Sequence, residues 1–206
     1  MKGDTGVGGL TAEIFARVVE FHGHMCPGLA LGIRAAEVAR AEVGLNSPEN
    51  PVVAIVETDL CPADAIQYLT GCTFGKGNFI HLDHGKNAFT FVRLRDGRGV
   101  RVVARPDAFG PPDPDFTALL EKVRSGQASA EERARFEEAQ RRRAEAILQA
   151  PLDRLFQVRP AEARVPPRNR AVRWEVCDGC GEPVLTSHLE RRDGGVYCRG
   201  CSGSAE

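Results

Sequence analysis

The chain has almost no net charge and no long apolar run. Its 206 residues carry 27 Lys and Arg against 28 Asp and Glu, which gives a formal net charge of −1. This balance argues against a nucleic acid or an anionic membrane as the partner of the whole protein. No stretch approaches the ~18 apolar residues of a membrane span, and residues 1–9 lack the basic and apolar regions of a signal peptide. We therefore expect a cytoplasmic protein.

Internal repeats and low-complexity tracts are also missing. A chain of this length can bury a real core, and we expect one main domain with a small appendage. Seven cysteines are present. In a cytoplasmic chain they indicate metal ligands or reduced thiols rather than a disulfide framework.

Two cysteines stand directly before prolines, in Cys26-Pro27 and Cys61-Pro62. Proline favours the first position of a helix, so each cysteine is predicted to be an N-cap whose thiol pKa is lowered by the positive helix end. His22 and His24 lie within four residues of Cys26. If the fold brings Cys61 to these three residues, the set forms a nitrogen and sulfur site suited to zinc or a similar transition metal. The alternative is packing, because free cysteines are often buried and lone histidines are often structural.

The C-terminal segment holds two CxxC pairs. They consist of Cys177, Cys180, Cys198 and Cys201, with seventeen residues between the pairs. Four thiolates at this spacing are typical of structural zinc sites, which have no open coordination position. Two disulfides or a redox pair are the alternative. We expect a bound zinc ion and a short hairpin that turns near Asp193-Gly194-Gly195.

Periodicity and turn residues predict the elements before residue 108. Apolar spacing and caps indicate helices after Thr11, from Pro27 to about Gly44, and over 62–70. Apolar runs indicate strands over 52–56, 79–82, 88–94 and 99–104. This order predicts an α+β domain over residues 1–108, with a two-layer core and a mixed sheet.

The following residues are predicted to be helical and then irregular. One helix begins at Asp113-Pro114, and a capping box at Ser129 opens another that runs to about Gln149. The second helix is highly charged, so we expect a solvated arm or a helix that packs on a partner. The Pro- and Arg-rich residues 151–167 indicate a linker. The predicted domains are thus 1–108, the arm and linker at 109–170, and a zinc finger at 171–206.

Four segments together resemble the FmdE family of formylmethanofuran dehydrogenase subunits. They are the double CxxC, Phe21-His-Gly-His-Met-Cys-Pro-Gly-Leu-Ala-Leu-Gly-Ile-Arg34, Glu57-Thr-Asp-Leu-Cys-Pro-Ala-Asp-Ala-Ile-Gln67 and Thr70-Gly-Cys-Thr-Phe-Gly-Lys-Gly-Asn78. The resemblance implies a core related to the second domain of glyceraldehyde-phosphate dehydrogenases, a homodimer and a treble-clef zinc finger. It also implies a member that stands alone rather than inside the dehydrogenase. Only five residues follow Cys201, so a zinc ribbon is the alternative to the treble clef.

Two polar residues in these motifs are candidates for catalytic roles. Asp64 lies three residues after Cys61, on the same helix face, where its carboxylate could orient a histidine ligand. Lys76 could supply positive charge to an anionic substrate or intermediate. The segment 71–77 is not a phosphate loop, because three residues separate its first two glycines and no Ser or Thr follows the lysine. Surface ion pairs are the alternative for both residues.

Two classes of function follow from these residues. In the first, the chain is an enzyme or an oxidoreductase subunit in one-carbon or redox metabolism. Cys26, Cys61, Asp64 and Lys76 would then act around a second transition metal that keeps an open position. In the second, the chain is a non-catalytic metal- or cofactor-handling module whose zinc finger docks a protein partner. Three protein ligands plus water would favour catalysis, whereas a closed shell of four would favour structure or storage.

Overall fold

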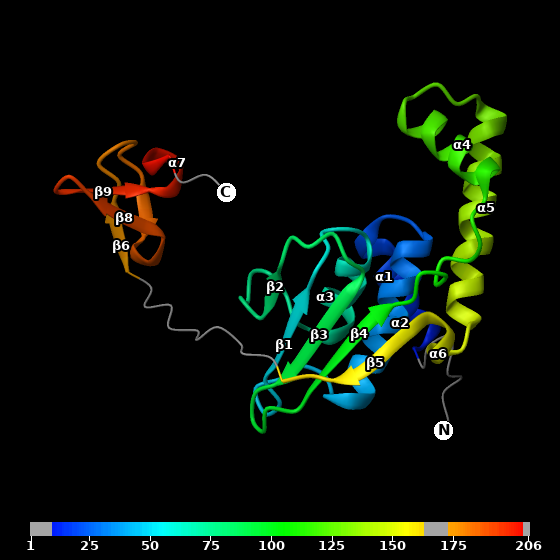
Figure 1. Ribbon diagram of the computed structural model, residues 1–206, viewed down its shortest axis with the longest axis horizontal. Coiled ribbons are helices and arrows are strands. Elements are labelled where there is room, and N and C mark those ends of the chain that lie inside the picture. The colour runs from blue at the N-terminus through cyan, green and yellow to red at the C-terminus, as the bar shows by residue number, and fades with distance from the viewer. Residues whose placement is uncertain (1–9, 163–172, 204–206) are drawn as a thin grey trace. The chain divides into compact units, whose positions relative to one another are not determined.

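The computed structural model describes residues 10–162 and 173–203 (Figure 1). The chain divides into two compact units, Met1–Val165 and Pro166–Glu206, which we call the core unit and the finger unit. In the described part of the chain, no helix is both long and apolar enough to cross a bilayer.

The core unit combines six helices and five strands among its described residues. In chain order they are α1 (Ala12–His22), α2 (Pro27–Glu42), β1 (Val52–Val56), α3 (Pro62–Thr70), β2 (Phe79–His81), β3 (Ala88–Arg93), β4 (Gly99–Ala104), α4 (Pro114–Arg124), α5 (Ala130–Gln149), α6 (Leu152–Leu155) and β5 (Phe156–Pro160). Helix starts and ends follow the expected signals. Thr11 caps α1 and Gly23 ends it in the left-handed conformation, while Ser129 and Glu132 form a complete capping box on α5.

The strands form one mixed sheet in the order β2-β1-β3-β4-β5. β1 and β2 are parallel and are joined by α3, whereas all other neighbours are antiparallel. α2 and α3 lie behind the sheet in Figure 1 and cover one of its faces. Alternate strand residues pack with these helices in one hydrophobic core: Val52, Ala54, Val56, Phe89, Phe91, Val100 and Val102. The predicted α+β class with a mixed sheet is confirmed.

The expectation of a linker over 151–167 is wrong for residues 152–160. They form α6 and β5, and β5 pairs with β4 from Phe156 opposite Ala104 to Pro160 opposite Val100. The last two turns of α5 are also part of the core, because Ala144, Ile147 and Leu148 are buried. The arm predicted to be solvated is therefore an insertion between two paired strands, anchored at its C-terminal end. Residues 151, 161 and 162 belong to no helix or strand, and residues 163–167 of the predicted linker lie outside the described residues.

The finger unit consists of two small hairpins and a one-turn helix. β6 (Trp174–Val176) pairs with β7 (Pro183–Leu185), and after the 3₁₀ turn Thr186–His188, β8 (Leu189–Arg192) pairs with β9 (Gly195–Cys198). The second hairpin turns at Asp193 and Gly194, as expected. Cys198 is the N-cap residue of α7 (Arg199–Ser202). A second cysteine pair at the start of a helix is the treble-clef arrangement, whereas a ribbon would place it in a second knuckle.

Candidate metal centre

Two glycines of α2 bring α3 close enough to place Cys61 beside Cys26. Gly28 and Gly32 lie one turn apart and face the start of α3. A Cβ atom on Gly28 would lie 2.9 Å from Cys61 Cβ, and one on Gly32 would lie 2.5 Å from the Pro62 carbonyl oxygen. Contacts this short do not occur with real side chains, so glycine is required for the approach. The thiols of Cys26 and Cys61 interact as a result.

The turn between α1 and α2 gathers three potential ligands. The ligand atoms of His22, His24 and Cys26 all lie within 4.8 Å of one another. His22 Nε2 is 3.8 Å from Cys26 Sγ. Nitrogen and sulfur ligands of one tetrahedral zinc ion would be about 3.6 Å apart, given bonds of ~2.05 and ~2.3 Å. The chemistry and spacing of the three groups therefore fit a transition metal, and the imidazoles of His22 and His24 stack with centroids 4.8 Å apart.

Asp64 contacts the ring nitrogen of His22 that points away from Cys26. His22 Nδ1 lies 2.7 Å from Asp64 Oδ2. A hydrogen on Nδ1 donated to this carboxylate leaves the lone pair on Nε2, the nitrogen that faces Cys26. Metal-binding histidines commonly have such a carboxylate partner, which fixes the ring and its tautomer. The His22 side chain is 10% exposed and the Asp64 side chain 39%, so solvent screens this contact only in part.

The two Cys-Pro starts differ from each other and from the expectation. Cys26 Sγ accepts a hydrogen bond from Leu29 N at 3.3 Å, as an N-cap should. Burial nevertheless raises the pKa of the Cys26 thiol to about 11, since desolvation outweighs that hydrogen bond and nearby Cys61 adds to the rise. The predicted depression of this pKa is wrong for the metal-free protein. Cys61 stands at the N-cap position of α3, as predicted, but it has helical backbone angles and its side chain makes no capping hydrogen bond.

His24 is the ligand candidate at the solvent side of the cluster. Its pKa is lowered from the ordinary value, first by burial and then by the neighbouring His22. A lowered pKa favours the neutral imidazole, the form that binds metals. Cys61 contacts Cys26 but does not belong to the set that lies within 4.8 Å. The described residues thus bring together a three-ligand group with a second thiol at its edge.

Lys76 lies away from this group within the chain. Its Nζ donates to the Gly71 carbonyl at 3.2 Å, next to the C-terminal end of α3. Cys61 and Asp64 lie at the other end of that helix. Nine helical residues rise about 13 Å, so the structure does not bring Lys76 to the cluster of its own chain.

The finger unit gathers the second group of potential ligands. The sulfurs of Cys177, Cys180, Cys198 and Cys201 lie within 4.8 Å of one another. Cys177 Sγ accepts from Cys198 N at 3.2 Å and from Gly179 N at 3.4 Å. Such backbone hydrogen bonds lower the pKa of the Cys177 thiol to about 6, and thiol neighbours raise the pKa of Cys201 to about 12. The four thiols cannot all lose their protons without a cation, because neighbouring thiolates repel one another. The group is therefore well suited to a dication such as zinc.

One cavity adjoins the histidine cluster, and sequence reasoning missed the residues that complete it. It has a volume of 370 Å³ and lies between His24 and Met25 on one side and the helices α4 and α5 on the other. Its remaining lining residues are Val123, Arg133, Phe136, Glu137 and Gln140. No sequence signal marks these residues as site residues, because only the packing of α5 on α2 carries them to His24.

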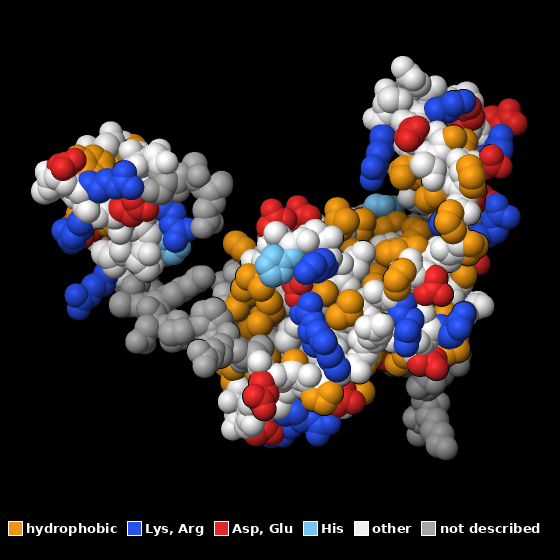
Figure 2. Space-filling view, viewed as in Figure 1, with side chains coloured by type: hydrophobic (Ala, Val, Ile, Leu, Met, Phe, Trp, Pro, Cys, Tyr) orange, Lys and Arg blue, Asp and Glu red, His pale blue; other side chains and the backbone are white. Residues whose placement is uncertain are grey.

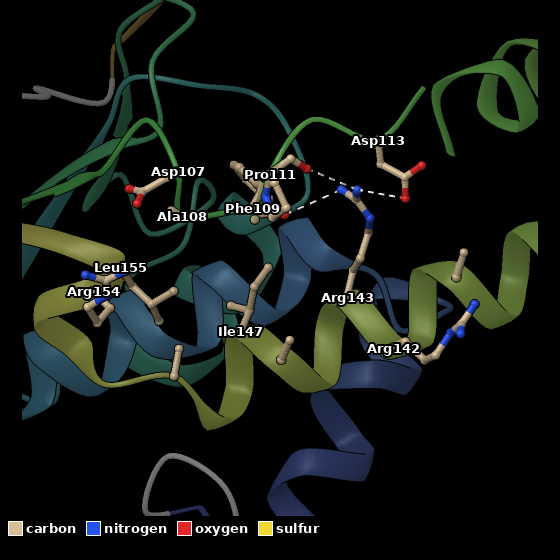
Figure 3. A pocket seen from close by; sticks show the side chains of 14 residues that line it. Asp107, Ala108, Phe109, Pro111, Asp113, Arg142, Arg143, Ile147, Arg154 and Leu155 are labelled. Atoms are coloured by element: carbon tan, nitrogen blue, oxygen red, sulfur yellow. Dashed lines mark hydrogen bonds and ion pairs between the residues drawn. The ribbon is translucent and has the colours of Figure 1, made fainter. Parts of the chain in front are cut away.

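A larger cavity of 540 Å³ lies farther along α5 and contains none of the predicted site residues. Figure 3 shows Arg143 reaching from α5 to the segment 107–113. Its guanidinium donates to the Phe109 carbonyl at 3.4 Å and to Asp113 Oδ2 at 3.2 Å. These hydrogen bonds connect the segment that precedes α4 to α5.

Comparison with known proteins gives three results. Residues 21–157 match the family described as FmdE, molybdenum formylmethanofuran dehydrogenase operon. A probable S-adenosyl-L-methionine-binding protein of Archaeoglobus fulgidus is 35% identical over 201 residues, which are 93% of this chain and 53% of that protein. The chain therefore spans about half the length of this relative. A tungsten formylmethanofuran dehydrogenase FmdE-like protein from Syntrophus aciditrophicus has a similar crystal structure, with a TM-score of 0.60, 23% identity and coverage of 100% of this chain and 98% of that one.

Proposed function

The chain belongs to the FmdE family, and from this premise we propose that it uses a transition metal at His22, His24 and Cys26 in one-carbon or redox chemistry. The finger unit holds a second, structural zinc ion at its four cysteines. The family and the two Cys/His groups support metal binding. The proposed chemical role rests on the geometry of the first group.

The observation that carries this proposal is the chain of contacts Asp64, His22, Cys26. The carboxylate fixes Nδ1 of His22 at 2.7 Å, while Nε2 faces the Cys26 sulfur at 3.8 Å. A histidine that only fills space needs no such orientation. In a metal site, the same arrangement fixes the ligand and increases its basicity.

Three ligands support catalysis rather than storage. With Cys61 outside the closely spaced set, a metal held by His22, His24 and Cys26 has an open position. A metal in such a site can polarise a carbonyl oxygen or lower the pKa of a bound water to ~7. The Cys26 thiol must lose its proton when the metal binds, so metal affinity increases with pH. Cys61, in contact with Cys26, would stay outside this shell and could donate its S–H to the Cys26 thiolate.

Cobalt titration of the metal-free full chain tests the proposal. Two equivalents of Co²⁺ should bind, one with the absorption of an all-thiolate site and one with that of a mixed nitrogen and sulfur site. The double variant His22→Ala/His24→Ala should bind only the first. A matched control, His81→Ala/His188→Ala, removes two exposed histidines elsewhere and should retain both. Retention of two equivalents by the first variant would refute the core metal site.

A second candidate function is the docking of a protein partner through the finger unit. Trp174 and Val176 lie two residues apart on β6, on the same face of the strand. Their exposed fractions are 61% and 57%. Exposed tryptophan is enriched at protein interfaces. A pull-down would compare wild type with Trp174→Ser and with the control Arg191→Ser, which changes another exposed residue of the finger unit. Docking through β6 is supported if a protein that binds wild type and Arg191→Ser does not bind Trp174→Ser.

S-adenosylmethionine is named for the archaeal relative, of which this chain spans about half. For this chain it is a ligand to test rather than an assigned one. Calorimetric titration of the full chain measures it directly. Saturable binding to the full chain would extend the relative's ligand to this chain.

A further inference from the structure

We propose that the 370 Å³ cavity beside His24 is the ligand pocket of the core metal site and that Arg133 makes it selective for small monocarboxylates. This inference rests on the proposed function, because it takes His24 to be a metal ligand. The α4–α5 arm is then a wall of the site and not a separate appendage.

His24 connects the cavity to the metal site. Its side chain belongs both to the three-ligand group and to the lining of the cavity. Cys26 is buried and does not line the cavity. A molecule in this space therefore meets the metal site from the His24 side, which is also its more exposed side.

The polar lining consists of one cation, one anion and one amide. Arg133 and Glu137 lie one turn apart on α5, with Gln140 in the next turn. Among the described residues neither Arg133 nor Glu137 has an ion pair or a side-chain hydrogen bond. Arg141 and Arg142 pair with Glu138, and Arg143 pairs with Asp113. Arg135 has no such partner among the described residues, but it does not line the cavity. Arg133 is exposed, so its side-chain donors face solvent and are open to a ligand that enters the cavity.

The charges define the class of ligand. A guanidinium binds a carboxylate through two parallel hydrogen bonds. Glu137 repels a second negative charge, so a monoanion is preferred to a dianion. Met25, Val123 and Phe136 provide an apolar wall for a short carbon chain. At ~30 Å³ for each water-sized volume, the cavity holds about a dozen such volumes and fits a ligand of roughly ten non-hydrogen atoms.

Ring contacts between α4 and α5 hold the walls of the cavity in place. Phe116 of α4 stacks on Phe136 of α5 with centroids 5.3 Å apart, and the Arg143 guanidinium lies 4.3 Å from the Phe116 centroid. Figure 1 shows α4 lying along the outer half of α5, whose inner half packs beside α2. Figure 2 shows acidic and basic side chains interspersed along this arm. The visible surface of the arm thus carries both signs of charge. Arg133 is a candidate because it lines the cavity, and not because the arm as a whole is basic.

The test uses the full chain loaded with Co²⁺, with butyrate as the monocarboxylate probe at constant ionic strength. Visible absorption reports the metal, and calorimetry reports butyrate binding independently. Wild type should show one saturable transition in both measurements. Arg133→Gln should weaken butyrate binding about 10- to 100-fold, the loss of a charged hydrogen bond. Arg135→Gln, which removes the same charge from the same helix outside the cavity, should leave it unchanged.

A second comparison tests the role of Glu137. Succinate should bind more weakly than butyrate to the wild type, and Glu137→Gln should narrow that difference. Equal butyrate affinity in Arg133→Gln and wild type, an equal loss in Arg135→Gln, or no butyrate binding at all would overturn the pocket. Failure of Co²⁺ to bind at the histidines would instead overturn the proposed function. Calorimetry on the metal-free chain would then test the pocket alone.

Discussion

Removal of the Asp64 carboxylate should weaken metal binding at the core site while leaving the fold intact. Asp64→Ala abolishes the 2.7 Å contact to Nδ1 of His22 and lets the imidazole turn away from Cys26. Asp64→Asn keeps an oxygen that can accept from Nδ1 but lacks the negative charge. We therefore expect the alanine variant to lose more affinity than the asparagine variant.

The magnitude follows from the exposure of the two groups. A hydrogen bond to a charged group contributes about 1.5–3 kcal/mol. Asp64 is 39% exposed and His22 only 10%, so screening by solvent places the pair in the lower half of that range. A loss of about 2 kcal/mol is a factor of roughly 30 in affinity. This lies within the ~10- to 100-fold effects of removing partners that orient metal ligands.

The assay is competition for Zn²⁺ or Co²⁺ between each variant and a chelator of known affinity, monitored by absorption. Asp59→Asn is the matched control, since it removes an exposed carboxylate five residues away. Urea unfolding of the metal-free variants should show changes within ~0.5 kcal/mol. Unchanged affinity in Asp64→Ala, or an equal loss in Asp59→Asn, would refute the orienting role of Asp64.

Three further predictions concern the finger, the sheet and the contact between α2 and α3. Cys177→Ser should lose one zinc equivalent, because the remaining thiols no longer close the shell, and metal analysis with limited proteolysis should detect the loss. Arg101 and then His84 lower the pKa of Glu57 from its ordinary value of 4.5, so the pair stabilises the fold above that pH and the contribution disappears as pH falls. Because the Glu57 side chain is 7% exposed, Glu57→Gln should cost about 2 kcal/mol in urea unfolding at pH 7, with a gap to wild type that closes in acid. Gly32→Ala places a Cβ 2.5 Å from the Pro62 carbonyl oxygen and should destabilise the chain by about 2–3 kcal/mol, as measured by the same unfolding assay.

Local signals were sufficient to predict most of the fold. The helix over 62–70 and the strand over 52–56 agree with the structure at both ends, because Pro62, Gly71 and a short apolar run mark their bounds. β5 could not be predicted in this way. Its five residues end in proline and follow the four-residue helix α6, and they form a strand only because β4 offers a free edge. Local composition does not indicate that β5 pairs with a strand about fifty residues earlier in the chain.

The candidate site was predictable where neighbouring residues form it. His22, His24 and Cys26 come from one turn, and the spacing of Asp64 on α3 predicts its direction. The state of Cys26 was not predictable, because its pKa depends on burial that only the packed core supplies. Arg133 was not predictable either. Its place beside His24 depends on the buried stripe Phe136, Ala144, Ile147 and Leu148, which fixes the rotation of α5.

Trp174 is the only tryptophan of the chain, and it lies in the finger unit. Tryptophan fluorescence excited at long ultraviolet wavelengths therefore reports on the finger alone, while far-ultraviolet circular dichroism is dominated by the helices of the core unit. Fluorescence thus measures the finger unit, and circular dichroism mainly measures the core unit. Melting of the finger on chelation and melting of the core in urea can be followed separately in one sample, with no label added.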